Sequence, residues 1–361
     1  MFRLTVPARH GRHLLVGLLP PAGHVPVSSI TRRTLKHKAK VRPSPQATRK
    51  MTPELLPTKV AVTLRPLSDF QIRIKDLGIK HVTVQEAHEM YTKYMEASAA
   101  NQRPDGWREE FVRDTNASAA KLHETATLVL ALPALRSSEF EFFCTMMEAA
   151  AGLGDDAAAL SLGRVLQRTR ARHDYFHWDQ PRWRRVRDRC MALIEEGRDA
   201  NALVLKGLVH LRRNDPTDDS LALEAFVQAE AVGRSAGRFD WEPACLEGQG
   251  EAHQRLNQKR QAEEAFRRLA DLDCARGYFR LARLLPRSES TLDWLTKAAA
   301  SGLSETYQLL VDEHERLRGI CADQGREKEA RRHEQDAAEW TSIMRARAMR
   351  DKELGIAAEP I

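Results

Sequence analysis

The stretch RARHDYFHWDQPRWRR, residues 170–185, contains side chains that could perform chemistry in several different ways. His173 and His177 are four residues apart, and Asp174 and Asp179 could add oxygen ligands to a metal ion. A metal site needs three or four converging ligands with an ordered second shell. Because two histidines at this spacing are common by chance, metal binding is the weakest interpretation, and we expect no metal or cofactor.

The same stretch could bind single-stranded RNA, because aromatic rings stack on bases while arginines contact phosphates. It could also anchor a partner protein, since Trp, Tyr and Arg often dominate binding energy at protein interfaces. In another interpretation the aromatic rings fold back into the core, while the arginines are solvated or paired with nearby acidic residues. The candidate partner-binding residues here are Tyr175, Phe176, Trp178, Trp183, Arg182, Arg184 and Arg185.

The sequence contains no motif that is typical of an enzyme. It has no glycine-rich phosphate loop, no H-E-x-x-H, no G-x-S-x-G and no paired cysteine ligands. His314 and His333 lie in highly charged segments that read as helices, and we interpret both as solvated. The five cysteines are odd in number and widely spaced, so we expect reduced side chains in the core and no disulfide framework. We therefore expect a protein that is not an enzyme and binds no small-molecule substrate.

Charge is distributed unevenly along the chain. Residues 1–53 hold 11 Lys or Arg and no acidic residue, so the remainder holds 57 − 11 = 46 basic residues against 50 acidic ones, a net charge of −4. The body is therefore not a polycation, which argues against general electrostatic binding to nucleic acid. No apolar run reaches the roughly 18–20 residues that cross a bilayer, so we expect no membrane span.

The acid-free N-terminus is rich in Arg, Lys, Ser and Thr, which is typical of a mitochondrial transit segment. We predict such a disordered segment over residues 1–50 and a location in the mitochondrial matrix. A basic nuclear tract, a secretory signal and a simple basic tail are the alternatives. Several prolines then indicate a linker over residues 51–82, and alternating β-branched residues between 59 and 84 predict one or two short strands.

Beyond residue 82, nearly every stretch reads as a helix between short Gly, Pro, Asn or Asp clusters. Thr83, followed by Glu86 three residues later, predicts a capping box at the start of an N-terminal helical region over residues 83–136. At the other end, residues 319–361 are predicted to form a long charged helix and a tail. This helix would cap the preceding array, with docking of a partner as the alternative.

A repeated pattern fills residues 137–318. DAAALSLGRVL from Asp156 matches DANALVLKGLVHL from Asp199, and each copy follows a helix that ends in small residues. Further copies open at Ala244, Ala275 and, more weakly, Thr306. A helix pair of this size cannot bury its apolar stripe alone, so we expect stacked pairs that share one continuous core.

The spacing of the repeats locates two insertions. Openings at residues 157, 200, 244, 275 and 306 differ by 43, 44, 31 and 31 residues, so the first two units are the longer ones. The first surplus is the stretch that begins at residue 170, which is predicted to be a loop leading into an arginine-rich helix. The second surplus includes Trp241, which joins the candidate partner-binding residues. Insertions in repeat arrays emerge as loops, often on the binding face.

Ala-x-x-Leu-Gly openings and closings such as WLTKAAASGL from Trp294 resemble Sel1-like repeats, which are relatives of tetratricopeptide repeats (TPR). The resemblance covers residues 142–317 and implies an α/α solenoid with a protein-binding adaptor surface. Such surfaces often serve assembly or quality-control complexes. The chain departs from the family in the missing glycine-rich turn between paired helices, and Gly163 and Gly207 are shifted by one relative to each other.

Together these features predict an all-α protein, an α/α solenoid of Sel1/TPR-like pairs. The predicted function is a non-catalytic mitochondrial scaffold or assembly factor with protein partners, serving a respiratory complex or the translation machinery. The alternative is an RNA-binding helical-repeat factor for mitochondrial transcripts. Such factors repeat their base-reading positions once per unit, and no regular pair of this kind occurs in the sequence.

Overall fold

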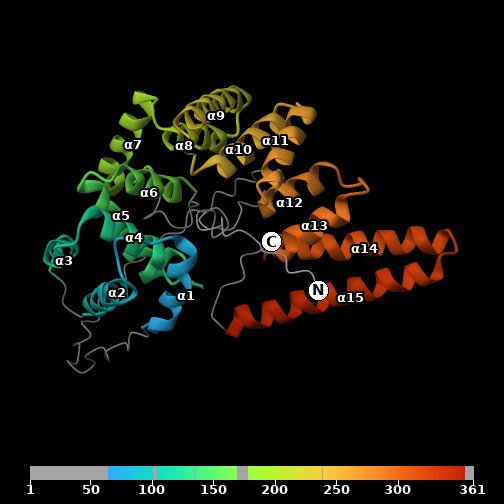
Figure 1. The fold of residues 1–361 in the computed structure, drawn as a ribbon, viewed down its shortest axis with the longest axis horizontal. Coiled ribbons are helices and arrows are strands. Elements are labelled where there is room, and N and C mark those ends of the chain that lie inside the picture. Colours follow the sequence, from blue (N-terminus) through green and yellow to red (C-terminus); the bar gives the residue numbers. More distant parts are fainter. Residues whose placement is uncertain (1–63, 101–103, 134, 169–177, 238, 354–361) are drawn as a thin grey trace, which may run out of the picture.

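The computed structural model describes residues 64–353 apart from residues 101–103, 134, 169–177 and 238. The described residues form α-helices joined by short connections, with one short 3-10 helix and no β-strand (Figure 1). An all-α fold is therefore confirmed for this part of the chain. The predicted transit segment and residues 51–63 of the predicted linker lie outside the described residues.

The helices follow one another along the chain, and the 3-10 helix is η3 (Pro181–Trp183). The α-helices are α1 (Leu67–Leu77), α2 (Val84–Ser98), α3 (Trp107–Thr115), α4 (Ala119–Leu130), α5 (Ser137–Gly152), α6 (Asp156–Arg168), α7 (Arg184–Glu196), α8 (Ala200–Arg213), α9 (Pro216–Ala236), α10 (Glu242–Arg255), α11 (Lys259–Asp271), α12 (Ala275–Leu284), α13 (Thr291–Ala300), α14 (Glu305–Asp323) and α15 (Glu327–Glu353).

Helix α1 occupies the segment for which short strands were predicted, so that prediction is wrong for its described part. Phe70 is fully buried, and Ile74 and Leu77 pack against the same core, whereas Ile72 is 63% exposed. The buried positions therefore follow the helical spacing of three and four residues and not the alternation of a strand. Gly78, with a φ of 62°, ends the helix in the left-handed conformation.

The predicted capping box at the start of α2 is confirmed. The Glu86 N–H donates to the Thr83 hydroxyl at 3.2 Å, and the Thr83 N–H donates to the Glu86 carboxylate at 2.8 Å. This reciprocal pair satisfies two backbone donors that a helix start leaves unpaired. It fixes the orientation of α2, which buries Tyr91 and Tyr94 against Phe142 of α5.

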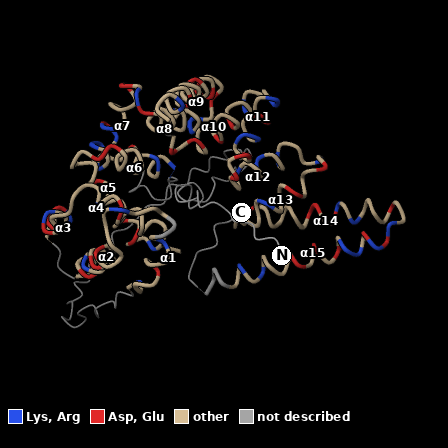
Figure 2. Tube along the Cα trace, viewed as in Figure 1, with Lys and Arg blue, Asp and Glu red and all other residues tan. Residues whose placement is uncertain are grey.

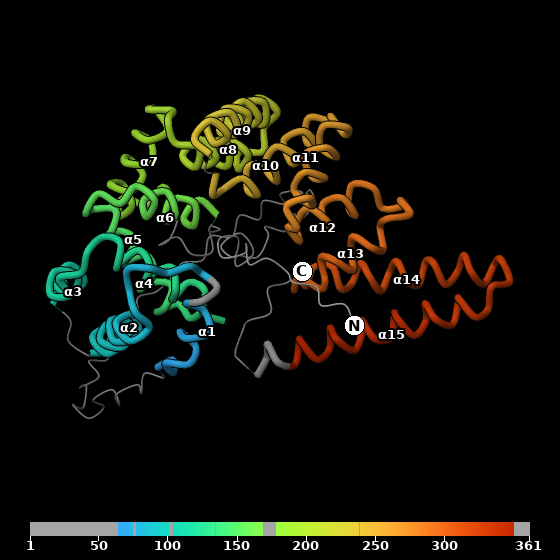
Figure 3. Tube along the Cα trace, in the orientation of Figure 1, coloured from blue at the N-terminus to red at the C-terminus, as the bar shows by residue number. Residues whose placement is uncertain are grey.

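From α4 to α15, each helix packs against the helix before it and the helix after it. Contacts between alternate helices also join α6 to α8 and α8 to α10. The helices trace an arc, in which α6, α10 and α12 lie toward the inner side and α7, α9 and α11 toward the outer side (Figure 1). The hairpin of α14 and α15 extends from the end of this arc (Figure 3).

The apolar core follows the order of the chain. One cluster of buried side chains reaches from Phe70 to Leu205, a second from Leu203 to Ala252, and a third from Ala262 to Leu310. Trp241 packs against both the first and the second cluster. Each helix pair thus shares its interior with its neighbours along the chain, as stacked pairs must.

Glycines let large aromatic side chains approach the helix backbones. A Cβ atom at Gly207 of α8 would lie 2.5 Å from the ring of Phe226 in α9. A Cβ at Gly248 of α10 would collide with the same ring from the other side. Phe226 therefore sits between two inner helices whose spacing depends on the missing side chains.

Helices α6 and α8 begin in the same way. The side chains of Asp155 and Asp199 each accept a hydrogen bond from the backbone N–H three residues later, at 3.0 and 2.9 Å. The sequence match that paired Asp156 with Asp199 is therefore displaced by one residue. Gly163 and Gly207 each lie 8 residues after the aspartate that caps their helix, so the two glycines are equivalent. The shift expected between these glycines does not exist in the structure.

The predicted long charged helix near the C-terminus is present as α15. It packs against α14, where the rings of Tyr307 and Trp340 stack with centroids 5.6 Å apart. The five cysteines form no disulfide and four of them are buried, as expected. Among the described residues, every helix is too short or too polar to cross a membrane.

Candidate functional site

The two aromatic residues of the predicted partner-binding stretch that the structure describes lie away from the surface. Tyr175 and Phe176 are outside the described residues. Trp178 and Trp183 are 8% and 0% exposed and belong to the first core cluster. Trp178 packs on α6 so closely that a Cβ at Gly163 would lie 2.8 Å from its ring. This placement matches the interpretation in which the aromatic rings fold back into the core.

The three arginines of the predicted site lie at the start of the arginine-rich helix α7, which is present as predicted. The Arg182 guanidinium stacks over the Trp183 ring at 4.4 Å from the centroid and lies 3.9 Å from Glu148. Arg184 is exposed and lies 3.5 Å from an aspartate one turn later, and Arg185 is exposed. Arg184 and Arg185 are the most exposed of the predicted site residues that the structure describes, whereas Arg182 and Trp241 are half-buried.

Trp241, the last predicted site residue, is half-buried beside a group of residues that the sequence analysis did not single out. Its backbone N–H donates to the Asn201 side-chain oxygen at 3.1 Å. The guanidinium of Arg164 in α6 lies over its ring, 4.7 Å from the centroid. A cation over an indole ring is attracted by the negative ring face, so Trp241 helps to position Arg164.

Arg164 belongs to a group that we call the arginine cluster: Arg164 and Arg168 of α6, and Arg276 and Arg280 of α12, around Glu247 of α10. Arg280 donates to the Glu247 carboxylate at 3.0 Å, and Arg276 lies 3.6 Å from the same oxygen. Side chains of three helices far apart in the sequence thus meet. The helices themselves lie toward the inner side of the arc (Figure 1).

Arg164 and Arg168 have no acidic partner within the described part of the chain. Arg164 is only 8% exposed, and neither side chain forms a hydrogen bond or an ion pair there. Burial and, to a lesser extent, the nearby charge of Arg168 lower the pKa of Arg164 to about 10. Burial also lowers the pKa of Arg168 below its usual value. Both groups stay charged at neutral pH, and a desolvated charge without a partner is costly.

Glu247 is the central anion of the cluster. Burial acts to raise its pKa, but the charges of Arg280, Arg276 and Arg168 outweigh this effect and hold the pKa below its usual value. Arg280 also contacts Glu251 at 3.2 Å. The four guanidinium groups of the cluster therefore face two carboxylates, which leaves a local charge of +2.

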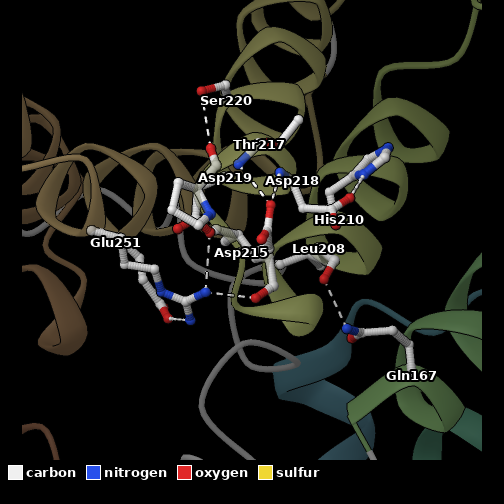
Figure 4. Close-up of polar contacts among 12 residues, drawn as sticks. Gln167, Leu208, His210, Asp215, Thr217, Asp218, Asp219, Ser220 and Glu251 are labelled. Atoms are coloured by element: carbon white, nitrogen blue, oxygen red, sulfur yellow. Dashed lines mark hydrogen bonds and ion pairs between the residues drawn. The ribbon is translucent and has the colours of Figure 1, made fainter.

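A ladder of hydrogen bonds at the C-terminal ends of α6, α8 and α10 holds these helices side by side. The Gln167 amide donates to the Leu208 carbonyl at 2.8 Å (Figure 4). Arg212 donates to the Gln167 carbonyl at 2.5 Å, and Arg255 donates to the Leu211 carbonyl at 2.6 Å. A cation at a helix C-terminus also complements the helix dipole. The ladder therefore fixes α6 relative to α10, and with them the arginine cluster.

The rest of the described surface has mixed charge. Lys and Arg alternate with Asp and Glu along the helices (Figure 2), so the cluster is a local excess and not part of a long basic stripe. Two hollows, of about 260 and about 550 Å³, lie beside α9, and neither contains a residue of the arginine cluster.

The sequence carries a signal for the cluster that the sequence analysis missed. Arg164 and Arg168, Glu247 and Glu251, and Arg276 and Arg280 are three pairs of like charges four residues apart. Such spacing places both members of a pair on one face of a helix. Like charges at this spacing destabilise a helix on their own, which indicates that another element compensates them.

Comparisons with family models, with curated proteins and with solved structures find no match for this chain. The class of protein is therefore defined by the described geometry, a helical-repeat-like all-α fold with a buried arginine cluster on its inner side.

Proposed function

We propose that the protein is a non-catalytic scaffold, built as a Sel1/TPR-like α/α solenoid, that binds an acidic segment of a partner protein at the arginine cluster. The solenoid is supported by the packing of each helix on its chain neighbours and by a core that follows chain order. The observation that carries the proposed binding is the pair of desolvated guanidinium groups, Arg164 and Arg168, without a carboxylate partner among the described residues.

An acidic segment would supply carboxylate partners for Arg164 and Arg168. Carboxylates accept two parallel hydrogen bonds from one guanidinium, and these charge-assisted bonds are about twice as strong as neutral ones. The inner side of a solenoid is an extended surface suited to a linear segment. Trp241 beside Arg164 adds an aromatic edge of the kind that anchors partners at protein interfaces.

The proposed location is the mitochondrial matrix, with a respiratory complex or the translation machinery as the client. The support for this part is the acid-free, arginine-rich N-terminal sequence. Import of the full chain into isolated mitochondria tests it, with and without the membrane potential. Import that proceeds equally well without the potential, or no import at all, contradicts the proposed location.

The binding proposal is tested by fluorescence anisotropy with the full-length protein and three probes: a Glu/Asp-rich peptide, a neutral peptide of equal length, and single-stranded RNA. We expect the acidic peptide to bind and its affinity to fall only modestly as salt is added, because partly buried charge pairs are screened less than exposed ones. In the double variant Arg164→Gln, Arg168→Gln, we expect the affinity to fall by about tenfold or more, which corresponds to ~1.4 kcal/mol or more.

The matched control is Arg184→Gln, Arg185→Gln, which removes two exposed arginines of α7 and should leave peptide binding unchanged. Thermal unfolding should show that the cluster variant is no less stable, because it loses buried unpaired charges. RNA binding that is lost in the α7 control would favour the RNA-binding alternative. Trp178 and Trp183 argue against that alternative, since their buried rings cannot stack on bases.

A further inference from the structure

A second group of chemistry-bearing side chains lies in the terminal hairpin, away from the arginine cluster in the sequence. His314 of α14 faces His333 and Asp336 of α15. The sequence analysis interpreted both histidines as solvated, which is wrong for His314, since it is only 5% exposed. His333 and Asp336 are half-buried. An imidazole inside a charged helical hairpin needs a partner for its ring nitrogens.

The potential ligand atoms of these three residues converge. The Nδ1 atoms of His314 and His333 are 3.1 Å apart, and the Asp336 carboxylate lies 3.7 Å from the His314 Nδ1. One ligand atom from each residue lies within 4.8 Å of the other two. His333 and Asp336 are three residues apart on α15, which places them on one face of that helix.

We propose that His314, His333 and Asp336 form a binding site for a zinc ion that links α14 to α15. Zinc binds His nitrogen and carboxylate oxygen at roughly 2.0–2.2 Å in tetrahedral geometry, so neighbouring ligand atoms lie about 3.3 Å apart. The observed separations of 3.1 and 3.7 Å bracket this value. Two nitrogens and one oxygen leave the fourth position for water or a partner's side chain.

Two arginines of α14 near this position are paired with other carboxylates. Arg316 donates to Glu313 at 2.6 and 2.9 Å, and Arg318 lies 3.7 Å from Glu334. Each of these guanidinium groups therefore pairs with a carboxylate other than that of Asp336. A zinc ion would be bound by one carboxylate oxygen and two imidazole nitrogens, ligand types that zinc ions select.

A metal ion bound by both helices would also stabilise the hairpin of α14 and α15. Among the described residues of α15, the buried apolar ones are Ala330 and Ala337, whose small side chains remove little apolar surface from water. Tyr307 and Trp340 supply the larger contact between the two helices. Coordination by residues of both helices would add a stabilising crosslink to the end of the helical array. This inference does not depend on the proposed binding of acidic segments.

The test uses the full-length protein stripped of metal with a chelator and titrated with ZnCl₂ by calorimetry. We expect one equivalent to bind at this site, with an affinity reduced by about tenfold or more in His333→Gln and in Asp336→Asn. Neither change removes the buried His314, so the hairpin should keep its fold, which circular dichroism checks. Substitution of Co²⁺ for zinc should give the absorption of tetrahedral cobalt, and this absorption should be weakened in both variants.

His253→Gln is the matched control, because His253 is also half-buried and contacts Gln258 outside the group. Its zinc affinity should equal that of the unaltered protein. Zinc should raise the thermal unfolding temperature of the unaltered protein and of this control, but not of the two site variants. Absence of zinc binding, or equal affinity in the unaltered protein and in His333→Gln, would overturn the proposal.

Discussion

The buried charges of this protein differ in whether they have partners. Glu139 of α5 is fully buried and accepts hydrogen bonds from Arg65 at 2.7 and 2.9 Å, from the Tyr91 hydroxyl at 3.0 Å, and from the Arg136 N–H at 2.8 Å. These bonds join the segment before α1 to α2 and α5. Arg164 is buried to a similar degree without such partners among the described residues. The first arrangement is typical of structure and the second of a binding site.

We expect Glu139→Gln to lower the free energy of unfolding by about 3 kcal/mol, because the buried Arg65 guanidinium then loses the charge of Glu139. Urea unfolding at neutral pH measures this change. The matched control is Glu89→Gln on the exposed side of α2, where the ion pair with Lys93 is solvated. That change should stay within ±0.5 kcal/mol or so. Equal effects of the two substitutions would contradict a stabilising role for the buried pair.

The lowered pKa of Glu139 predicts how the free energy of unfolding changes with pH. Burial acts to raise the pKa of Glu139, but the hydrogen bonds from Arg65 and Arg136 outweigh it and hold the pKa below its usual value. The stabilisation is therefore fully present above the unfolded-state pKa of about 4.3 and is lost as the pH falls through the lower folded-state pKa. The stability difference between the unaltered protein and Glu139→Gln should accordingly shrink below about pH 4.3.

Individual residue environments could be predicted from the sequence only in part. The reduced cysteines follow from composition and spacing, and the structure confirms them. The burial of Trp178 and Trp183 did not follow, because it depends on Gly163 and other residues of α5 to α8 that meet these rings only in the folded chain. His314 looked solvated because its sequence neighbours are charged, whereas its actual neighbours are on α15.

At the scale of single helices, boundaries with a local chemical cause were predictable. The capping box of Thr83 and Glu86 needs only residues three apart, and the structure confirms it. The segment of α1 was predicted wrongly because Phe70, Ile72 and Ile74 fit a strand's alternation, while Phe70 and Ile74 also fit helical spacing. The two patterns differ only in whether Ile72 is buried, and that depends on the neighbouring helices α2 and α4.

The effect of a Gly→Ala substitution on the free energy of unfolding depends on whether another helix packs against that glycine. Gly207 of α8 faces the Phe226 ring, and a Cβ there would lie 2.5 Å from it. We expect Gly207→Ala to lower the free energy of unfolding by about 1–3 kcal/mol, because overpacking exceeds the gain in helix propensity. Chemical denaturation measures the change, and Phe226→Leu in the same chain should recover part of it.

Gly319 of α14 is the matched control, since it is exposed and has no atom within 4 Å of a Cβ built there. Gly319→Ala should raise the free energy of unfolding by about 0.5–1 kcal/mol through helix propensity alone. The two substitutions are chemically identical and should have opposite signs. If both stabilised the protein, the close packing of α8 on Phe226 would not exist.

At the scale of the whole molecule, helix content and the pairing of neighbouring helices could be predicted from the repeats. The alignment of those repeats was off by one residue because Asp155 and Asp156 both resemble a helix cap, and only the hydrogen bond to Asp155 distinguishes them. The like-charge pairs of the arginine cluster can be recognised in the sequence, but their meeting could not be predicted, because it requires the inner faces of α6, α10 and α12 to come together. No local pattern encodes that meeting, which depends on how each pair is rotated relative to the next.

Because the core clusters follow the order of the chain, we expect a substitution in the core to destabilise only the helices near it. Phe266 of α11 is fully buried in the third core cluster, and Phe142 of α5 is fully buried in the first. Phe266→Ala should cost about 3–5 kcal/mol. In an array whose units contact only their neighbours, this loss should speed hydrogen exchange in α10 to α13 and leave α2 to α5 nearly unchanged.

Phe142→Ala is the matched substitution and should give the reverse pattern, with faster exchange in α2 to α6 and little change in α11 to α13. Hydrogen exchange with peptide-level mass spectrometry resolves both regions in one experiment. A single cooperative core would instead show faster exchange in all helices after either substitution. That result would remove the support for the solenoid, because the three core clusters would then behave as one. Opposite patterns in the two variants require an interior that is divided along the chain.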